Sequence, residues 1–556
     1  MIKEHPWLKT YPDHPKWDMD IPNGTVIDSF DQTVASRPNA IGMDFMGKPY
    51  TWAELGAAAN KFAAALQQRG VKKGTKIGLF LPNCPYFLIA YYGTLKIGAT
   101  VVNYNPLYAK AELAHQIEDS ETDIMVTLDL KMMTDKAQTM LTDTRLNTII
   151  LCPFTDILPF PKNILFPIVK RKDLAKLEPN KRILAYNDFI DNDGTYTPAK
   201  ITPETDLAVL QYTGGTTGVP KGAMLSHRNI YANAYQALVN FPETDEPASM
   251  LSILPFFHVF AMTLCMNMAV MAGMTILTIP RFDLKDALKI IHKKRPHYMP
   301  AVPAIFSAIN NFKQLKKYDL SSLTFCISGG APLPVEVKTK FEAKTGCTVV
   351  EGYGLTETSP VATVNPPTGE NIAGSIGLPL PQTIIEIIST EDQSTPMPIG
   401  ERGEVCIQGP QVMMGYYNNA EATANTIKNG RLHTGDIGIM KENGYTYIVD
   451  RIKDMIITNG YNVYPRNIEE AIYQHPSVEE CIVAGLPDKQ RGEIVKAWIK
   501  LKDNRTLTPE DLKTFLKERI SPMEIPKRIE FRTEPLPKTM IGKLSRKDIV
   551  AEELEK

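Results

Sequence analysis

The sequence predicts an α/β protein, with a large N-terminal domain of doubly wound sheets plus a small β-barrel, and a small, mobile α+β C-terminal domain. The chain has 556 residues, too many for a single hydrophobic core. Helical and strand patterns alternate between Gly24 and Asp206, as in a doubly wound fold. A charged segment, Asp450–Asp454, lies between apolar strands and precedes a last unit of about 100 residues. We therefore expect an N-terminal domain at residues 1–450, a hinge at 451–453 and a C-terminal domain at 454–556.

Local signals predict the first elements. Thr51 and Glu54 have the spacing of a capping box, so a helix should begin there, run to Gln68 and stop at Gly70. Apolar runs without helical spacing indicate buried strands. We expect strands at 76–81, 100–102, 124–127 and 148–151, and a helix at 86–96.

Composition and charge narrow the function. The formal net charge of −1 excludes a general nucleic-acid binder, which would carry a basic excess. The seven cysteines are odd in number and show no Cys-x-x-Cys spacing, which indicates reduced thiols in a cytoplasmic protein. The nine histidines include no His-Glu-x-x-His pattern, so a zinc site is not expected.

Two apolar segments raise the question of a membrane. Residues 261–279 contain Asn267 and Gly273 and end at Pro280, so we expect a buried helix and a strand there, with no membrane span. Residues 154–172 are apolar and end in Lys170–Lys172, a composition that suits an anionic membrane face. The alternative is a loop packed on its own domain or on a second copy in a homodimer. We favour packing slightly, because the prolines should prevent an amphipathic helix.

The segment Tyr212–Gly222 has the composition of a phosphate-binding loop. A short apolar run, Leu207–Gln211, precedes it, and Pro220 and Lys221 close it. Glycines let the backbone approach an anion, threonines add hydroxyl donors, and successive backbone N–H groups form a concave anion site. The spacing does not match the P-loop of kinase-type NTPases. The expected phosphate-binding residues are Thr213, Gly214, Gly215, Thr216, Thr217, Gly218 and Lys221.

Further motifs follow at other predicted strand ends. His258 closes the aromatic segment Leu254–His258, and Gly330 and Ala331 lie in a turn of small residues against which a flat base or an acyl chain fits. The motif Glu351–Thr358 should form a turn that offers a ring, a hydroxyl and one carboxylate, enough for a nucleotide-bound Mg²⁺. Its expected contributors are Gly352, Tyr353, Gly354, Thr356 and Glu357.

The C-terminal half supplies the remaining candidates. Asp436 follows a Thr-Gly turn in Leu432–Asp436 and is suited to accept hydrogen bonds from ribose hydroxyls. Arg451 and Lys453 belong to the charged segment at the domain joint. Gly460 and Tyr461 lie in a glycine turn just after it, and Lys543 lies in the glycine-flanked turn near the C-terminus.

These motifs, in this order, resemble those of the AMP-forming acyl-CoA synthetases, an adenylate-forming superfamily. The likeness extends from Pro6 to Arg546. Within the superfamily the chain looks like a bacterial long-chain fatty-acid–CoA ligase. The segments that carry this finer likeness are Leu158–Leu165, Pro255–His258, Val350–Gly354 and Asn462–Arg466.

The resemblance implies a two-step reaction. A fatty acid and ATP, with Mg²⁺, give an acyl-adenylate and pyrophosphate, and coenzyme A then displaces AMP. It also implies that Lys543 contacts the carboxylate and the α-phosphate, and that the C-terminal domain rotates about Lys453 so that Gly460 and Tyr461 replace it. The implied catalytic residues are Lys543, Lys221, Glu357, Thr356 and His258, with Glu357 on the metal and Arg451 among the cofactor-binding residues.

Other functions stay open on the sequence. A related enzyme could act on a medium-chain or aromatic acid, or pass a fatty acyl-adenylate to a carrier protein. A non-enzymatic relative would bind an adenylate without chemistry, but the presence of Lys221, Glu357, Asp436 and Lys543 counts against it. Two segments depart from the usual pattern of relatives: Asn429–Arg431, and Met523–Pro526, where Glu524 replaces a lysine that would suit coenzyme A.

Overall fold

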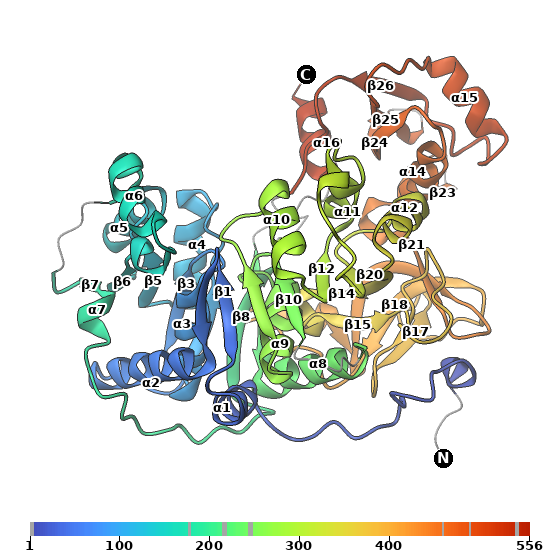
Figure 1. The fold of residues 1–556 in the computed structure, drawn as a ribbon. Helices are drawn as coiled ribbons and strands as arrows, with labels where there is room; N and C mark the ends of the chain where they lie inside the picture. Colours follow the sequence, from blue (N-terminus) through green and yellow to red (C-terminus); the bar gives the residue numbers. More distant parts are fainter. Residues whose placement is uncertain are drawn as a thin grey trace.

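The structure is a computed structural model that describes residues 5–175, 180–213, 220–242, 248–458, 461–488, 491–539 and 544–555. Two large sheets lie side by side in the N-terminal domain, an antiparallel unit flanks the second, and the C-terminal domain lies above that side (Figure 1). The predicted α/β class, with a large and a small domain, is confirmed. In the described ranges, none of the helices combines the length and apolar character needed to span a membrane.

The first sheet has seven strands, in the order β7 (Ile183–Ala185), β6 (Thr148–Cys152), β5 (Ile124–Leu128), β3 (Lys76–Phe80), β4 (Thr100–Asn103), β8 (Leu207–Thr213) and β9 (Lys221–Ser226). The pairing of β8 with β9 is antiparallel and the other pairings are parallel. The predicted capping box is present, since Thr51 and Glu54 bond each other's backbone N–H. The main helices of this half are α2 (Trp52–Gln68), α3 (Pro85–Lys96), α4 (Lys110–Ser120) and α5 (Lys131–Asp143).

The second sheet has nine strands, in the order β16 (Leu378–Pro379), β15 (Val361–Val364), β14 (Thr348–Gly354), β13 (Phe325–Ser328), β12 (Tyr298–Ala301), β10 (Ser249–Ser252), β11 (Thr275–Thr278), β1 (Ile41–Phe45) and β2 (Lys48–Thr51). Its central pairings are parallel, and those at both ends are antiparallel. As predicted for residues 261–279, a buried helical segment (Ala261–Met268) leads to β11. The other helices are α1 (Val26–Ser36), α7 (Tyr186–Phe189), α8 (His227–Val239), α9 (Ala269–Met271), α10 (Leu284–Lys294), α11 (Pro303–Asn310), α12 (Val335–Thr345) and α13 (Ala420–Thr426).

The small β unit is a five-stranded antiparallel sheet of β17 (Ile384–Ile388), β18 (Arg402–Gln408), β20 (Arg431–Met440), β19 (Ile427–Lys428) and β21 (Thr446–Arg451). The sequence suggested a barrel here. Among the described residues, β17 does not pair with β19 or β21, so the strand order is that of an open sheet. Strand β21 ends at the joint and leads directly into the C-terminal domain.

The C-terminal domain is an α+β unit with its own core. Its strands are β23 (Tyr461–Val463), β22 (Ile456–Thr458), β25 (Gly492–Leu501), β24 (Val478–Asp488) and β26 (Arg528–Arg532), and its helices are α14 (Pro465–Tyr473), α15 (Pro509–Lys517) and α16 (Arg546–Leu554). Ile468, Val483 and Leu512 lie in one apolar cluster between the sheet and the helices, separate from the core of the large domain. This separation allows the domain to move as a unit.

The expectation that prolines prevent a helix in residues 154–172 was wrong. α6 (Lys162–Val169) forms with Pro161 at its N-cap and Pro167 inside it. Pro161 costs little there, because the first turn of a helix does not need its N–H groups. Phe166 packs on Phe154, with ring centroids 5.1 Å apart, so the segment is partly anchored.

Candidate active site

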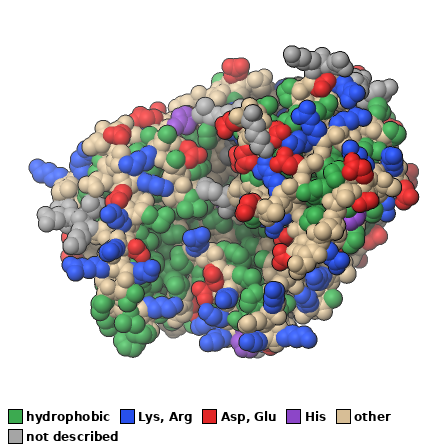
Figure 2. Space-filling view, turned by 90° about the horizontal axis from the view of Figure 1, so that it is seen from above, with side chains coloured by type: hydrophobic (Ala, Val, Ile, Leu, Met, Phe, Trp, Pro, Cys, Tyr) green, Lys and Arg blue, Asp and Glu red, His purple; other side chains and the backbone are tan. Residues whose placement is uncertain are grey.

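The sequence motifs meet where the sheet strands end. Thr213 ends β8, Gly329 and Gly330 follow β13, and Gly354 ends β14. Ligands of open α/β sheets bind beyond the carboxyl ends of parallel strands. Seen from above, this face is hollowed between two lobes, and hydrophobic side chains gather in the hollow (Figure 2). The fold therefore gathers the predicted site at one face.

The structure describes the two ends of the predicted phosphate-binding loop, Thr213 and Lys221. Thr213 and Lys221 lie opposite each other in the β8–β9 hairpin, and the Lys221 Nζ lies 5.1 Å from the centre of the Tyr416 ring. Gly214, Gly215, Thr216, Thr217 and Gly218 lie outside the described residues. Lys221 therefore lies at the loop end of the β8–β9 pairing.

The motif Glu351–Thr358 is arranged differently from the prediction. Gly352 and Gly354 do not make a turn: both lie within β14 and pair with β15. A Cβ at Gly354 would lie 1.8 Å from the Pro360 carbonyl oxygen, so this glycine permits a close backbone approach. The turn follows at Thr356–Thr358 and carries Glu357.

Half-buried Tyr353 and buried Asp436 form a hydrogen-bonded pair. The Tyr353 hydroxyl donates to Asp436 Oδ2 at 2.7 Å, and Arg451 Nε lies 3.0 Å from Asp436 Oδ1. Burial raises the pKa of Tyr353 well above its usual value, so the hydroxyl stays a donor. The structure thus brings together three predicted residues that are far apart in the sequence.

Glu357 has a neighbour that the sequence did not indicate. The Tyr416 hydroxyl donates to Glu357 Oε1 at 2.6 Å, and the Lys221 cation lies over the same ring. Glu357 and Tyr416 line a cavity of about 280 Å³ together with Glu404 and with His433, Thr434 and Gly435 of β20. A carboxylate at the wall of a polar cavity fits a single protein ligand to a nucleotide-bound Mg²⁺. Tyr416 follows a glycine in an otherwise unremarked segment, and only its partners identify it.

The predicted turn of small residues follows β13. Gly330 has a φ of +79°, which favours glycine, and a Cβ at Gly329 would lie 3.1 Å from the Phe260 ring. Glu351 holds this turn in place, because its carboxylate accepts the N–H groups of Leu333 and Gly374 at 3.1 and 3.0 Å. Ala331 is half-buried beside it.

His258 is half-buried just before the helical segment Ala261–Met268. Its Nδ1 accepts the Phe260 N–H at 3.3 Å, and burial lowers the pKa of the imidazole to about 4. At neutral pH the ring is therefore uncharged, which suits a hydrogen-bonding wall better than a cationic group.

The joint is described on both sides of Lys453. Asp450 is 3% exposed, and its carboxylate accepts the backbone N–H groups of Arg451 and Arg466, both at 2.8 Å. Arg546 pairs with Asp454 at 2.9 Å and with Glu469 at 2.6 Å. Lys453 is exposed, yet surrounding atoms and the Arg451 charge lower its pKa.

The structure describes only some of the predicted site residues beyond the joint. Gly460 and Lys543 lie outside the described residues, and Tyr461 is placed only as the start of β23. Glu524, the departure at the expected lysine, accepts hydrogen bonds from the N–H and hydroxyl of Ser521, both at 2.9 Å. Its carboxylate is thus engaged in its own turn.

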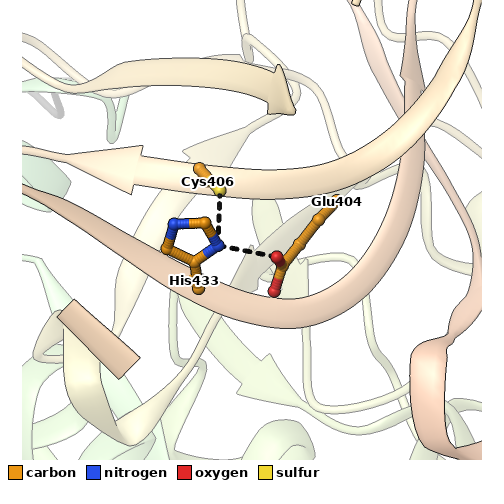
Figure 3. Close-up of side chains that lie close together, drawn as sticks. All are labelled: Glu404, Cys406 and His433. Atoms are coloured by element: carbon orange, nitrogen blue, oxygen red, sulfur yellow. Dashed lines mark hydrogen bonds and ion pairs between the residues drawn. The ribbon is translucent and has the colours of Figure 1, made fainter. Parts of the chain in front are cut away.

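A further buried cluster lies behind Asp436. His433 Nδ1 lies 2.7 Å from Glu404 Oε2 and 3.4 Å from Cys406 Sγ (Figure 3). The three donor atoms lie within 4.8 Å of one another, close enough for a metal ion. Burial and the Glu404 charge raise the pKa of the Cys406 thiol, which disfavours the thiolate that a metal would need. The 2.7 Å contact is better explained as a hydrogen bond.

Comparisons with known proteins agree with this geometry. The AMP-binding enzyme family model matches residues 30–417, and the AMP-binding enzyme C-terminal domain matches residues 467–543. The chain is 43% identical to a long-chain-fatty-acid–CoA ligase of Bacillus subtilis, covering 100% of this chain and 99% of that protein.

Two solved structures are also similar over almost their whole length. An anthranilate CoA ligase in complex with anthranoyl-AMP gives a TM-score of 0.85 at 25% identity, covering 96% of this chain and 99% of that one. ATP-bound MatB from Rhodopseudomonas palustris gives 0.83 at 26% identity, covering 95% and 99%.

Proposed function

The chain belongs to the AMP-binding enzyme family, and on that premise we propose that it joins a long-chain fatty acid to coenzyme A with ATP. The carboxylate attacks the α-phosphate of ATP, releasing pyrophosphate and leaving an acyl-adenylate. The thiol of coenzyme A then attacks the acyl carbon and AMP leaves. The observation that carries the proposal is the end-to-end similarity to a relative named long-chain-fatty-acid–CoA ligase.

Asp436 is the proposed ligand of the ribose. Each of its carboxylate oxygens already has one partner, Tyr353 or Arg451. A carboxylate oxygen has about two acceptor sites, so each can take one further hydrogen bond from a ribose hydroxyl. The fixed neighbours hold the carboxylate in place before the nucleotide arrives, which favours binding.

The phosphates are the proposed target of the cationic and glycine-rich groups. Thr213 and Lys221 lie opposite each other where the β8–β9 pairing ends, and the sequence between them, Gly214–Gly218, supplies the expected backbone donors. Lys543, near the end of the sequence, is the proposed cation from the C-terminal domain. Glu357, beside Thr356, would hold Mg²⁺, which when bound neutralises charge on the phosphate oxygens. Catalysis then rests on positioning and charge neutralisation.

The acyl chain is proposed to lie against the turn of small residues after β13. A Cβ at Gly330 would meet only Val302 Cγ1, at 3.7 Å, so a chain can lie close to this turn. At Gly329 the Phe260 ring lies 3.1 Å from an added Cβ and supplies an apolar surface. Uncharged His258 is half-buried, so an apolar chain can pass it without stripping water from a charge. This surface favours an extended hydrocarbon, the part of the substrate with most area to bury.

The test is an acid panel with purified protein. We expect ATP–pyrophosphate exchange and thioester formation with coenzyme A to be highest for acids of about sixteen carbons, because each buried methylene contributes about 0.8 kcal/mol. Equal rates with acetate or coumarate would show that the long-chain assignment is wrong. Transfer to a carrier protein in place of coenzyme A would identify the other enzyme class.

We also propose that α6 rests on an anionic phospholipid surface. The turn and helix expose five large apolar side chains, Phe160, Ile164, Leu165, Ile168 and Val169, at 79, 55, 50, 70 and 73%. Lys162, Lys170, Arg171 and Lys172 are exposed at the two ends of this helix. Apolar groups fringed by cations match the headgroup boundary of an anionic bilayer, and no span is needed.

Vesicle sedimentation tests this contact. Replacing Lys170, Arg171 and Lys172 by Gln should weaken binding to phosphatidylglycerol vesicles roughly a hundredfold, at about 1 kcal/mol per cation. The matched control replaces Lys313, Lys316 and Lys317, which are also exposed, and should retain binding. No binding by the unmodified protein, or an equal loss in the control, rules the contact out. If the protein is a dimer and Ile168→Asn makes it a monomer, the surface would instead be assigned to a second copy of the chain.

A further inference from the structure

Asp436 projects from an irregular stretch of β20. Across the β18–β20 ladder, Glu404 lies opposite Ile437 and Cys406 opposite His433. The single residue Val405 therefore faces Thr434, Gly435 and Asp436, which makes these three a bulge. Gly435 has a φ of +73°, which only glycine adopts readily. Bulges of this kind re-aim a side chain next to a functional site.

Glu404 holds this bulge with both carboxylate oxygens. Oε1 accepts the Gly435 backbone N–H at 2.8 Å, and Oε2 lies 2.7 Å from His433 Nδ1. Glu404 is 4% exposed, so water does not compete for these bonds. The remaining bonds are local: the Thr434 hydroxyl donates to the Val405 carbonyl at 2.7 Å and accepts the Asp436 N–H at 3.0 Å.

The carboxylate also selects one form of His433. An ionised carboxylate only accepts hydrogen bonds, so the hydrogen of the neutral imidazole must be on Nδ1. His433 Nε2 is then a bare acceptor, and it is buried with no hydrogen-bond partner among the described residues. A buried unpaired acceptor costs less than a buried unpaired N–H. Glu404 thus supports the cheaper tautomer.

We propose that Glu404 is a positioning residue for the nucleotide. It acts through the Gly435 bulge and the His433 tautomer to keep the Asp436 carboxylate aimed at the ribose. The inference rests on the proposed function, because it assigns the ribose to Asp436. Glu404 lines the same cavity as Glu357, but both of its carboxylate oxygens are already bonded to Gly435 and His433. We therefore expect its effect to appear in ATP affinity before it appears in the chemical step.

The test is Glu404→Gln, which keeps the shape and removes the charge. The amide can still accept from Gly435, but its NH₂ faces His433 Nδ1 and forces the hydrogen onto the buried Nε2. We expect ATP affinity, measured calorimetrically with a non-hydrolysable analogue, to fall about tenfold. The acid KM and the kcat for exchange should change little, and the melting temperature should fall modestly because the buried Nε2–H has no partner. The ¹⁵N shifts of His433 should report the tautomer change.

Three comparisons make the result decisive. Glu386→Gln is the matched control, because Glu386 lies in the same sheet but pairs with Arg431 at 2.6 Å. It should leave ATP affinity unchanged. In Glu404→Gln the loss should shrink for 2′,3′-dideoxy-ATP, which lacks the hydroxyls that Asp436 would bind. On a D436N background, Glu404→Gln should add little further loss.

Several outcomes overturn the proposal. Unchanged ATP affinity in Glu404→Gln is one, and an equal loss for ATP and its dideoxy analogue is another. Stoichiometric zinc in the purified protein, lost in Glu404→Gln, would make the cluster a metal site. Failure of the proposed function looks different: the unmodified protein would show no exchange with any acid while still displaying the His433 tautomer.

Discussion

At the residue scale, two glycines of one strand serve different purposes. A Cβ at Gly354 would lie 1.8 Å from the Pro360 carbonyl oxygen, and the backbone there cannot yield. A Cβ at Gly352 would lie 3.0 Å from Ile327 Cδ1, the flexible end of a side chain. Gly354 is therefore required by backbone packing, whereas at Gly352 a larger residue would meet only a movable side chain.

Gly354→Ala should therefore lower the free energy of unfolding by about 3 kcal/mol or more, as severe overpacking does. Gly352→Ala is the matched control and should cost about 1 kcal/mol or less, because Ile327 can change rotamer. Thermal unfolding of both variants is the measurement. Similar melting temperatures for the two would mean that the β14–β15 turn shifts more readily than this geometry implies.

At the scale of elements, the sequence predicts a helix correctly where the interactions that start it lie within a few residues. The Thr51–Glu54 capping box and the helix that follows need no distant partner, so the sequence predicts them well. The expectation that prolines prevent a helix at α6 was wrong, because the effect of a proline depends on its position in the helix. Pro161 precedes the helix, and Pro167 removes a single hydrogen bond near its end. The sequence also predicts a turn at Gly352 and Gly354, which lie in β14, because composition alone does not distinguish a turn from a tightly packed strand.

The site shows the same division. Single residues such as Asp436 and Glu357 are visible in short motifs, since their chemistry is carried by residue type. Their supports are long-range contacts: Tyr416 reaches Glu357 across 59 residues, and Glu404 reaches His433 across 29. No periodicity encodes these pairings. They follow from strand order and register, which are properties of the sheet.

At the scale of the whole molecule, the joint links two units with separate cores. Asp450 ends the large domain, and its carboxylate bonds the Arg466 N–H at the start of α14. Arg546 ties α16 to Asp454, on the far side of Lys453. Rotation about Lys453 has to break the Asp450–Arg466 bond while the Arg546–Asp454 pair travels with the small domain. Arg546 also lies 3.9 Å from Asp450, and Arg402 lies over the Tyr464 ring, so a rotation at the joint would have to exchange these contacts as well.

Two variants separate the half-reactions of the proposed mechanism. In the proposed mechanism Lys543, which belongs to the C-terminal domain by sequence, serves the adenylate step only when that domain is closed. Lys543→Ala should then reduce ATP–pyrophosphate exchange about a hundredfold or more. It should still convert supplied acyl-adenylate and coenzyme A to thioester. Lys453→Pro fixes φ at the joint and should do the reverse, retaining exchange and losing thioester formation. Both activities are measured on each variant. Glu442→Pro is the control for a proline near the joint, because Glu442 is exposed at the second position of the Lys441–Gly444 turn, where proline is favoured. If each variant loses both activities equally, the domain does not rotate between the steps.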